Sequence, residues 1–200
     1  MTRTVSNSDP KTNHFDIVVI GAGLGGLYTL HKMLEQGYNV IAVEQGERIG
    51  GTWFWNQYPG CRCDVESLEY SYSFSEELQQ EWHWPEKYSK QTDILKYINH
   101  VADRFSLKQK IVLNTKIIDA RYDQIENIWR LRSSKNHSYS CDFCIMATGN
   151  LSVPNPPKLP RLEEFRVDSY HTGLWPSKHI DFSNKRVGLI GTGSSGVQAS

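Results

Sequence analysis

Two glycine-rich loops have the spacing G-x-G-x-x-G of a dinucleotide-binding turn: GAGLGG at residues 21–26 and GTGSSG at residues 191–196. Each directly follows a short apolar run, which is the context that the motif requires. In such a loop the first glycine permits a tight turn, the second lets the main chain approach a pyrophosphate, and the third lets helix and strand pack closely. The free N–H groups of the following helix then face the phosphates. Two loops predict two dinucleotides, naturally a flavin and a nicotinamide cofactor.

Polar side chains near the loops refine this prediction. Glu44 follows the next apolar run, where its carboxylate can accept hydrogen bonds from ribose hydroxyls and repel a 2′-phosphate. The first loop therefore suits FAD or NAD and disfavours NADP. At the second loop, the hydroxyls of Ser194 and Ser195 can add hydrogen bonds to a phosphate. The alternatives are a plain glycine turn beside an exposed glutamate, and a chance match at the second loop.

Four cysteines, in CRC at residues 61–63 and CDFC at residues 141–144, are further residues whose type could do chemistry. A four-cysteine zinc site is disfavoured because positions three apart in a strand point to opposite faces. A redox disulfide beside a flavin is a second alternative, but disulfide reductases usually have four residues between their cysteines, and CRC has one. We expect no metal, and free thiols in a reduced cytoplasmic protein.

The elements that must position the first loop follow from the hydrophobic pattern. Residues 15–20 and 39–44 predict buried parallel strands, and apolar residues at helical spacing between them predict a helix that Gly37 ends. This strand–helix–strand unit begins a Rossmann-type domain. Residues 92–105 predict a second helix, which either of its first two residues could cap.

The rest of the chain completes an α/β organisation. Residues 111–146, with IVLNTKIIDARY as their first strand-like run, predict a small β-meander, and residues 185–191 predict another buried strand. We therefore expect a Rossmann-type FAD-binding domain with a small β-meander, followed by the start of a second Rossmann-type, NADP-binding domain. The expected boundaries are a disordered leader (1–14), the FAD-binding domain (15–150), a proline-rich linker (151–184) and the start of the NADP-binding domain (185–200). A strand and glycine loop alone cannot bury their faces, so we expect the N-terminal part of a longer protein.

The composition excludes two classes of partner. The 22 Lys and Arg residues balance 22 Asp and Glu residues, so the formal net charge is zero. Nucleic-acid binders and polybasic membrane proteins need a positive face instead. No run approaches the roughly 18 apolar residues of a membrane span. We expect small-molecule partners.

Three features together resemble the Baeyer–Villiger monooxygenases, which are class B flavin monooxygenases. They are the two glycine loops, residues 50–64 (GGTWFWNQYPGCRCD), which resemble the family's G-G-T-W…Y-P-G…D segment, and residues 165–176 (FRVDSYHTGLWP). The last stretch resembles the family fingerprint F-x-G-x-x-x-H-x-x-x-W-P, with Val167 in the place of the glycine. EYSYSFSEELQQEW and ATGNLSVP are similar to the phenylacetone and steroid monooxygenase branch.

The resemblance implies a reaction. NADPH reduces FAD, a C4a-peroxyflavin attacks a ketone carbonyl, and one oxygen of O2 enters the product, an ester or lactone. No match to the family's catalytic arginine is found here, so we expect these 200 residues alone to be inactive on a ketone. The alternatives are a flavin N- or S-monooxygenase and a non-catalytic FAD-binding module.

The resemblance also assigns roles by position. FAD is expected at Gly21, Gly23, Gly26, Glu44, Thr52, Trp53, Phe54, Trp55, Asp64, Tyr70 and Ile117. NADP is expected at Arg62, Cys63, Asp64, Thr192, Gly193, Ser194, Ser195, Gly196, Val197 and Gln198. Asp64, near both flavin and nicotinamide, and His171, in the fingerprint hinge, are the expected catalytic residues. The plain alternatives are packing for the aromatic and apolar residues, a loop cap for Asp64, a surface charge for Arg62, and a loop pinned by His171 and Trp175.

Overall fold

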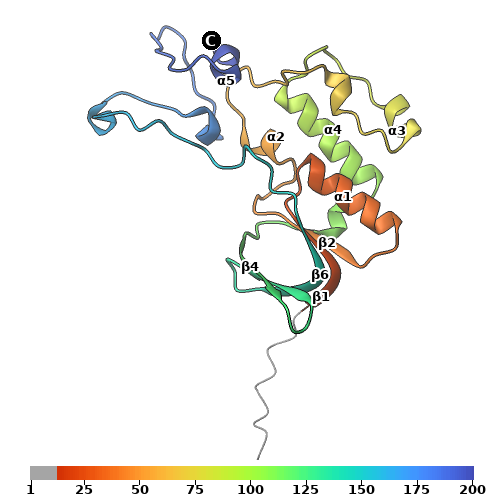
Figure 1. Cartoon of the computed structure of the whole chain (residues 1–200). Coiled ribbons are helices and arrows are strands. Elements are labelled where there is room, and N and C mark those ends of the chain that lie inside the picture. The colour runs from red at the N-terminus through yellow and green to blue at the C-terminus, as the bar shows by residue number, and fades with distance from the viewer. Residues whose placement is uncertain (1–12) are drawn as a thin grey trace, which may run out of the picture.

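The computed structural model describes residues 13–200 and is built on one six-stranded sheet of order β3-β2-β1-β6-β5-β4 (Figure 1). Strands β3, β2, β1 and β6 pair in parallel, and β5 and β4 continue the sheet from β6 in antiparallel pairing. Their bounds are β1 (Asn13–Ile20), β2 (Val40–Val43), β3 (Ile111–Val112), β4 (Ile117–Asp123), β5 (Ile128–Ser133) and β6 (Ser138–Met146). The predicted disordered leader lies mostly outside the described residues, but its last two residues belong to β1.

The predicted strand–helix–strand unit is confirmed. Helix α1 (Leu24–Glu35) joins β1 to β2, which pair in parallel. Gly37 follows the end of α1 with φ +83°, and its N–H donates to Leu34 O at 3.0 Å, as a glycine that ends a helix does. The apolar face of α1 is buried through Leu27 and Leu30.

The centre of β1 and all of β2 are buried on both faces, which is why these two strands contain unbroken apolar runs. Ile17 and Val19 of β1 pack with residues of α1 and α4 (Gln91–Arg104), whereas Val18 packs with Leu131 and Tyr139 of the antiparallel strands. Successive side chains of a strand point to opposite faces. The helices therefore cover one face of the sheet, and the curled antiparallel strands cover the other (Figure 1).

The run predicted as one strand at residues 111–122 is two strands at opposite edges of the sheet. Asn114 breaks it with φ +53°, and Thr115 is buried in the turn. The N–H groups of these two residues donate to Gly46 O and Glu44 O, both at 2.8 Å. The chain is thereby tied to the end of β2 before it crosses to begin β4.

Helix α4 begins one residue earlier than predicted, and the prediction of Thr92 or Asp93 as its cap is wrong. The capping position is Lys90, which makes no side-chain cap hydrogen bond. Lys90 instead forms a main-chain bridge with Arg62, and the N–H of Gln91 donates to Cys61 O at 2.8 Å. The helix starts where the chain leaves this pairing.

The remaining elements are short. They are α2 (Thr52–Trp55), α3 (Glu76–Glu81), α5 (Ser194–Gln198) and the 3₁₀ turns η1 (Ser67–Tyr70), η2 (Leu107–Lys110), η3 (Leu162–Glu164) and η4 (Thr172–Leu174). Among the described residues, none of the helices has the length and apolar character that crossing a membrane requires.

The strand predicted at residues 185–191 is not formed. Val187, Leu189 and Ile190 are 61%, 48% and 80% exposed, and no strand of the described chain pairs with this segment. An apolar run becomes a buried strand only where neighbouring strands complete its hydrogen bonds. Helix α5 nevertheless forms directly after it.

Candidate dinucleotide-binding site

The first glycine loop lies at the carboxyl end of β1, between β2 and β6. Crevices at such a switch in chain direction are where open α/β sheets bind ligands. Gly21 has φ +106°, and its N–H donates to Val43 O at 2.9 Å. A Cβ at Gly26 would overlap the carbonyl oxygen of Gly21, and one at Gly21 would overlap that of Ala147. The tight turn and the close helix–strand packing predicted for these glycines are both present.

Glu44 is buried beside this loop and binds its main chain. One carboxylate oxygen accepts from the N–H of Ala22 and the other from the N–H of Gly46, both at 2.7 Å. The side chain is 5% exposed. Each carboxylate oxygen has a second lone pair, so the predicted ribose contact is compatible with this geometry. Glu44 therefore also fixes the loop to the turn that follows β2.

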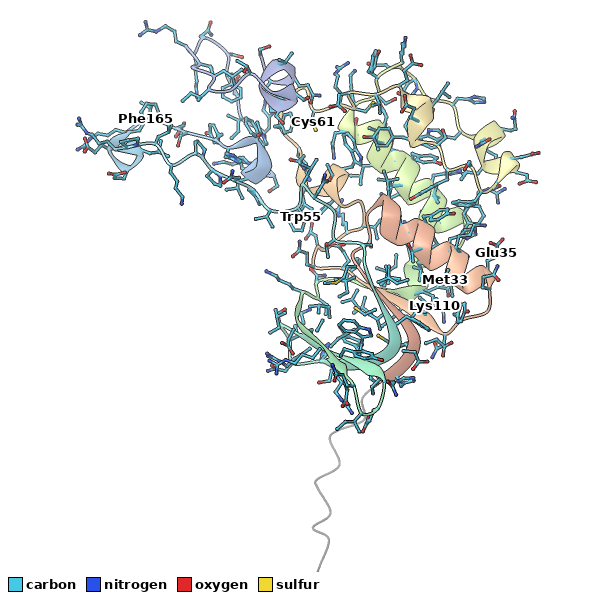
Figure 2. All side chains as sticks on the ribbon, viewed as in Figure 1. Met33, Glu35, Trp55, Cys61, Lys110 and Phe165 are labelled. Atoms are coloured by element: carbon cyan, nitrogen blue, oxygen red, sulfur yellow. The ribbon has the colours of Figure 1, made fainter. Side chains whose placement is uncertain are left out.

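The segment predicted to line the flavin begins against the first loop. Gly51, with φ +54°, is so close to Gly23 that an added Cβ would lie 2.9 Å from Gly23 Cα. Trp53 of α2 is buried, with its ring edge-on to Tyr70 at 5.4 Å between centroids. Trp55 is 41% exposed and lies between the sheet and the C-terminal segment (Figure 2). The four α2 residues thus divide between core packing and an open face.

Two further residues predicted for FAD, Tyr70 and Ile117, lie on different elements. Tyr70 ends η1 and is half-buried, and burial raises its pKa to about 12, so its hydroxyl stays protonated at neutral pH. Ile117 opens β4 and packs in the cluster between the sheet and the antiparallel strands. The chain just before Ile117 is bound to Glu44 through the N–H of Thr115.

The second glycine loop repeats the local geometry of the first. Gly191 has φ +121°, and Gly193 has φ −77° and ψ 178°, close to the φ −80° and ψ −167° of Gly23. A Cβ at Gly196 would overlap the carbonyl oxygen of Gly191, as happens between the corresponding glycines of the first loop. The turn is therefore encoded locally, since it forms here without a flanking strand.

Helix α5 brings the second loop onto the segment 58–64. Ser194 Oγ donates to Asp64 Oδ2 at 3.3 Å, and the Gln198 side chain binds the main chain of Arg62. The structure thus unites most residues predicted for NADP. Cys63 differs, because its thiol is buried and donates to Ser89 O at 3.4 Å, away from α5. Figure 2 shows Cys61 of the same segment beside α5.

Sequence reasoning missed two residues at this contact. Tyr58 donates its hydroxyl to Gln198 Oε1 at 2.8 Å, and Gly60, with φ +77°, lies against the main chain of Gln198. The signal was the Tyr-Pro-Gly sequence at residues 58–60, which marks a turn with a glycine in a conformation that other residues rarely adopt.

His171 and Trp175 flank the 3₁₀ turn η4, one at each end. His171 Nδ1 accepts from the N–H of Gly173 at 3.2 Å. Trp175 packs against the hydrophobic cluster between the sheet and the helices, and its ring centroid lies 5.5 Å from that of Tyr170. Val167, which stands in the place of the fingerprint glycine, is exposed and its φ is not positive, so a valine fits this position without backbone strain.

The cysteines separate into different parts of the core. Cys61 and Cys63 lie in the cluster under the helices, and Cys141 lies in the cluster on the other face of the sheet. Burial raises the pKa of the Cys61 thiol, and that of Cys141 to about 11. No group of potential metal ligands gathers among residues 13–200.

Comparison with known proteins agrees with this architecture. A family model described as pyridine nucleotide-disulphide oxidoreductase matches residues 18–200. A Baeyer-Villiger monooxygenase from Pseudooceanicola batsensis is 43% identical over 92% of this chain and 34% of its own length. A phenazine N-monooxygenase from Lysobacter antibioticus is 42% identical over 95% of this chain and 35% of its own length.

A solved structure of an oxidized steroid monooxygenase bound to NADP superposes with a TM-score of 0.88 and 48% identity, covering 94% of this chain and 36% of that one. The chain spans about a third of the length of the relatives that it matches. The chain belongs to the pyridine nucleotide-disulphide oxidoreductase family, and within it the chain is similar to the Baeyer–Villiger monooxygenases.

Proposed function

We propose that the protein is an FAD- and NADPH-dependent monooxygenase that inserts one oxygen of O2 beside a ketone carbonyl to give an ester or lactone. The observation that carries this proposal is the docking of the second glycine loop, through α5, onto segment 58–64. That segment follows α2 after two residues, and Gly51, the residue before α2, lies against Gly23 of the first glycine loop. Two dinucleotides bound to these loops would approach each other. The similarity to a Baeyer-Villiger monooxygenase and an NADP-bound steroid monooxygenase supports the ketone reaction.

The first turns of α1 and α5 suit the phosphates of such cofactors. The residue before each helix is a glycine, so no side chain at that position caps the first N–H groups. Neither helix has an acidic residue in its first turn. The first N–H groups of a helix have no partner within it and attract anions. FAD would lie at the first loop with Glu44, and NADP at the second loop with Arg62 and Asp64.

When bound, NADPH supplies a hydride and FAD supplies the oxygen-activating ring. The residues of this chain would bind and orient both cofactors. Asp64, which accepts a hydrogen bond from Ser194, would hold the nicotinamide end against the flavin, and α2 would shield the flavin from water. His171 would act in the hinge, where its ring fixes the turn η4.

The proposal includes the organisation of the chain. Residues 15–150 would be the FAD-binding domain, residues 151–184 the hinge linker, and residues 185–200 the first part of an NADP-binding domain. The partners would be a small ketone and O2. We also propose a cytoplasmic location, which the low cysteine content supports.

Replacing Asp64 in the full-length protein tests the proposal. The wild type should convert a ketone to an ester with NADPH and O2, with product measured by gas chromatography. Asp64→Ala should keep its FAD absorbance but form roughly a tenth or less of the wild-type amount of ester per NADPH consumed, because misplaced reactants lose rate steeply. Asp103→Ala is the matched control, because Asp103 of α4 forms only an exposed ion pair with Lys108 of η2. A wild type that consumes NADPH without forming an ester would contradict the ketone reaction.

Oxygenation of nitrogen is the second candidate, because the phenazine N-monooxygenase is nearly as similar as the Baeyer-Villiger enzyme. Supplying a phenazine in place of the ketone separates the two. An N-oxide formed faster than any ester would favour this second candidate.

A further inference from the structure

We propose that Gln198 is a positioning residue that joins α5 to segment 58–64 and so sets where the nicotinamide cofactor lies relative to the flavin. The inference rests on the proposed function and adds a role to it. The resemblance assigns Gln198 to NADP binding, but its amide is bonded to Tyr58 and Arg62, so Gln198 would act through these two residues and not by touching the cofactor.

Both polar atoms of the Gln198 amide form hydrogen bonds with segment 58–64. Its oxygen Oε1 accepts from the Tyr58 hydroxyl at 2.8 Å and from the Arg62 N–H at 3.2 Å. Its nitrogen Nε2 donates to the carbonyl oxygen of Arg62 at 3.1 Å. The amide therefore pairs with both main-chain groups of one residue, as a neighbouring β-strand would.

The main chains approach closely at the same point. Gly60 has φ +77°, and a Cβ there would overlap the carbonyl oxygen of Gln198. Only glycine permits both this conformation and this approach. The contact is thus built from two sides, by a glycine on segment 58–64 and by the amide on α5.

Tyr58 provides a stable donor for the contact. Its side chain is 8% exposed, and burial raises its pKa to about 12. The hydroxyl therefore remains protonated across the range in which the protein would work. A glutamine suits the opposite position because it offers an acceptor and a donor together, whereas a carboxylate offers acceptors alone.

The test uses the full-length protein loaded with FAD. Gln198→Met keeps the length of the side chain and removes its polar atoms, and Tyr58→Phe removes one hydroxyl. Each lost hydrogen bond is worth several-fold in an equilibrium constant, so we expect the KM for NADPH and the dissociation constant of NADP⁺ to rise roughly tenfold in Gln198→Met. FAD content should match that of the wild type.

The same two replacements, glutamine by methionine and tyrosine by phenylalanine, are made at surface positions as controls. Gln79→Met alters an exposed glutamine of α3, and Tyr38→Phe alters a half-exposed tyrosine two residues before β2. Both should stay within about twofold of the wild type, as surface changes usually do. The dissociation constant of NADP⁺ for the double variant Tyr58→Phe/Gln198→Met should be within about twofold of that for Gln198→Met, because the two residues share one hydrogen bond.

Amide exchange at Arg62 reads the contact without any turnover. Its N–H is bonded to Gln198 Oε1, so exchange measured by NMR should accelerate in Gln198→Met and not in Gln79→Met. If Gln198→Met leaves both the exchange rate and the NADP⁺ affinity unchanged, the proposal is overturned. It is also overturned if the affinity for FAD falls by the same factor as the affinity for NADP⁺. If the wild type forms no ester while exchange accelerates and NADP⁺ affinity falls, the positioning role stands and the ketone reaction fails.

Discussion

Gly26→Ala in the full-length protein is expected to lower the free energy of unfolding by about 1–3 kcal/mol, the usual cost of an overpacked site. The added Cβ would overlap the carbonyl oxygen of Gly21, which is main chain and cannot rotate away. Helix α1 must then move off the loop, so FAD affinity should fall roughly tenfold to a hundredfold. Chemical denaturation without added FAD and a flavin titration measure the two effects.

The neighbouring Gly25 supplies the control for this prediction. It lies in the same turn of α1, is exposed, and has open space within 4 Å of an added Cβ. Gly25→Ala should therefore raise the free energy of unfolding by about 0.5–1 kcal/mol, because alanine loses less entropy than glycine in a helix. If the two substitutions change stability equally, close packing at Gly26 is not what the loop requires.

Glu44→Gln is expected to cost about 1.5–3 kcal/mol of unfolding free energy, in the range of a hydrogen bond to a charged group. The carboxylate accepts from two main-chain N–H groups, of Ala22 and Gly46, at a buried position. A glutamine amide offers one acceptor, and its NH2 group would face the other N–H donor. Weaker FAD binding should accompany the loss, because the same bonds hold the first loop.

Glu47→Gln is the matched substitution, since Glu47 follows in the same turn and its side chain is 66% exposed. Its effect on unfolding should stay within about 0.5 kcal/mol. Equal stability of Glu44→Gln and the wild type in chemical denaturation would show that the N–H groups find other partners.

The sequence predicted the elements whose signals are local. The β-branched runs around Val18 and Ile41 predicted the parallel strands, and Gly37 correctly marked the end of α1. The spacing of glycines predicted both loops, and the second one forms its turn even without a paired strand. Periodicity and turn chemistry depend on neighbouring residues, so they can be read from the chain itself.

Predictions about features that depend on residues distant in the sequence were wrong at three places. The run at residues 111–122 gives no sign of splitting, because the split depends on hydrogen bonds from Asn114 and Thr115 to Gly46 and Glu44. The start of α4 was misplaced for the same reason, since Lys90 is paired with Arg62. At residues 185–191 the apolar pattern was present, but the described chain supplies no strand to pair with it.

The sequence by itself determined the two glycine turns, the apolar runs of the central strands and the residue types available for chemistry. Only the tertiary structure decided that Glu44 binds two main-chain N–H groups, that the Cys63 thiol faces inward, and that Gln198 reaches Tyr58 and Arg62. The physical reason is that a turn is set by the dihedral preferences of a few adjacent residues, whereas the partner of a polar side chain is set by which segments the packed core brings together.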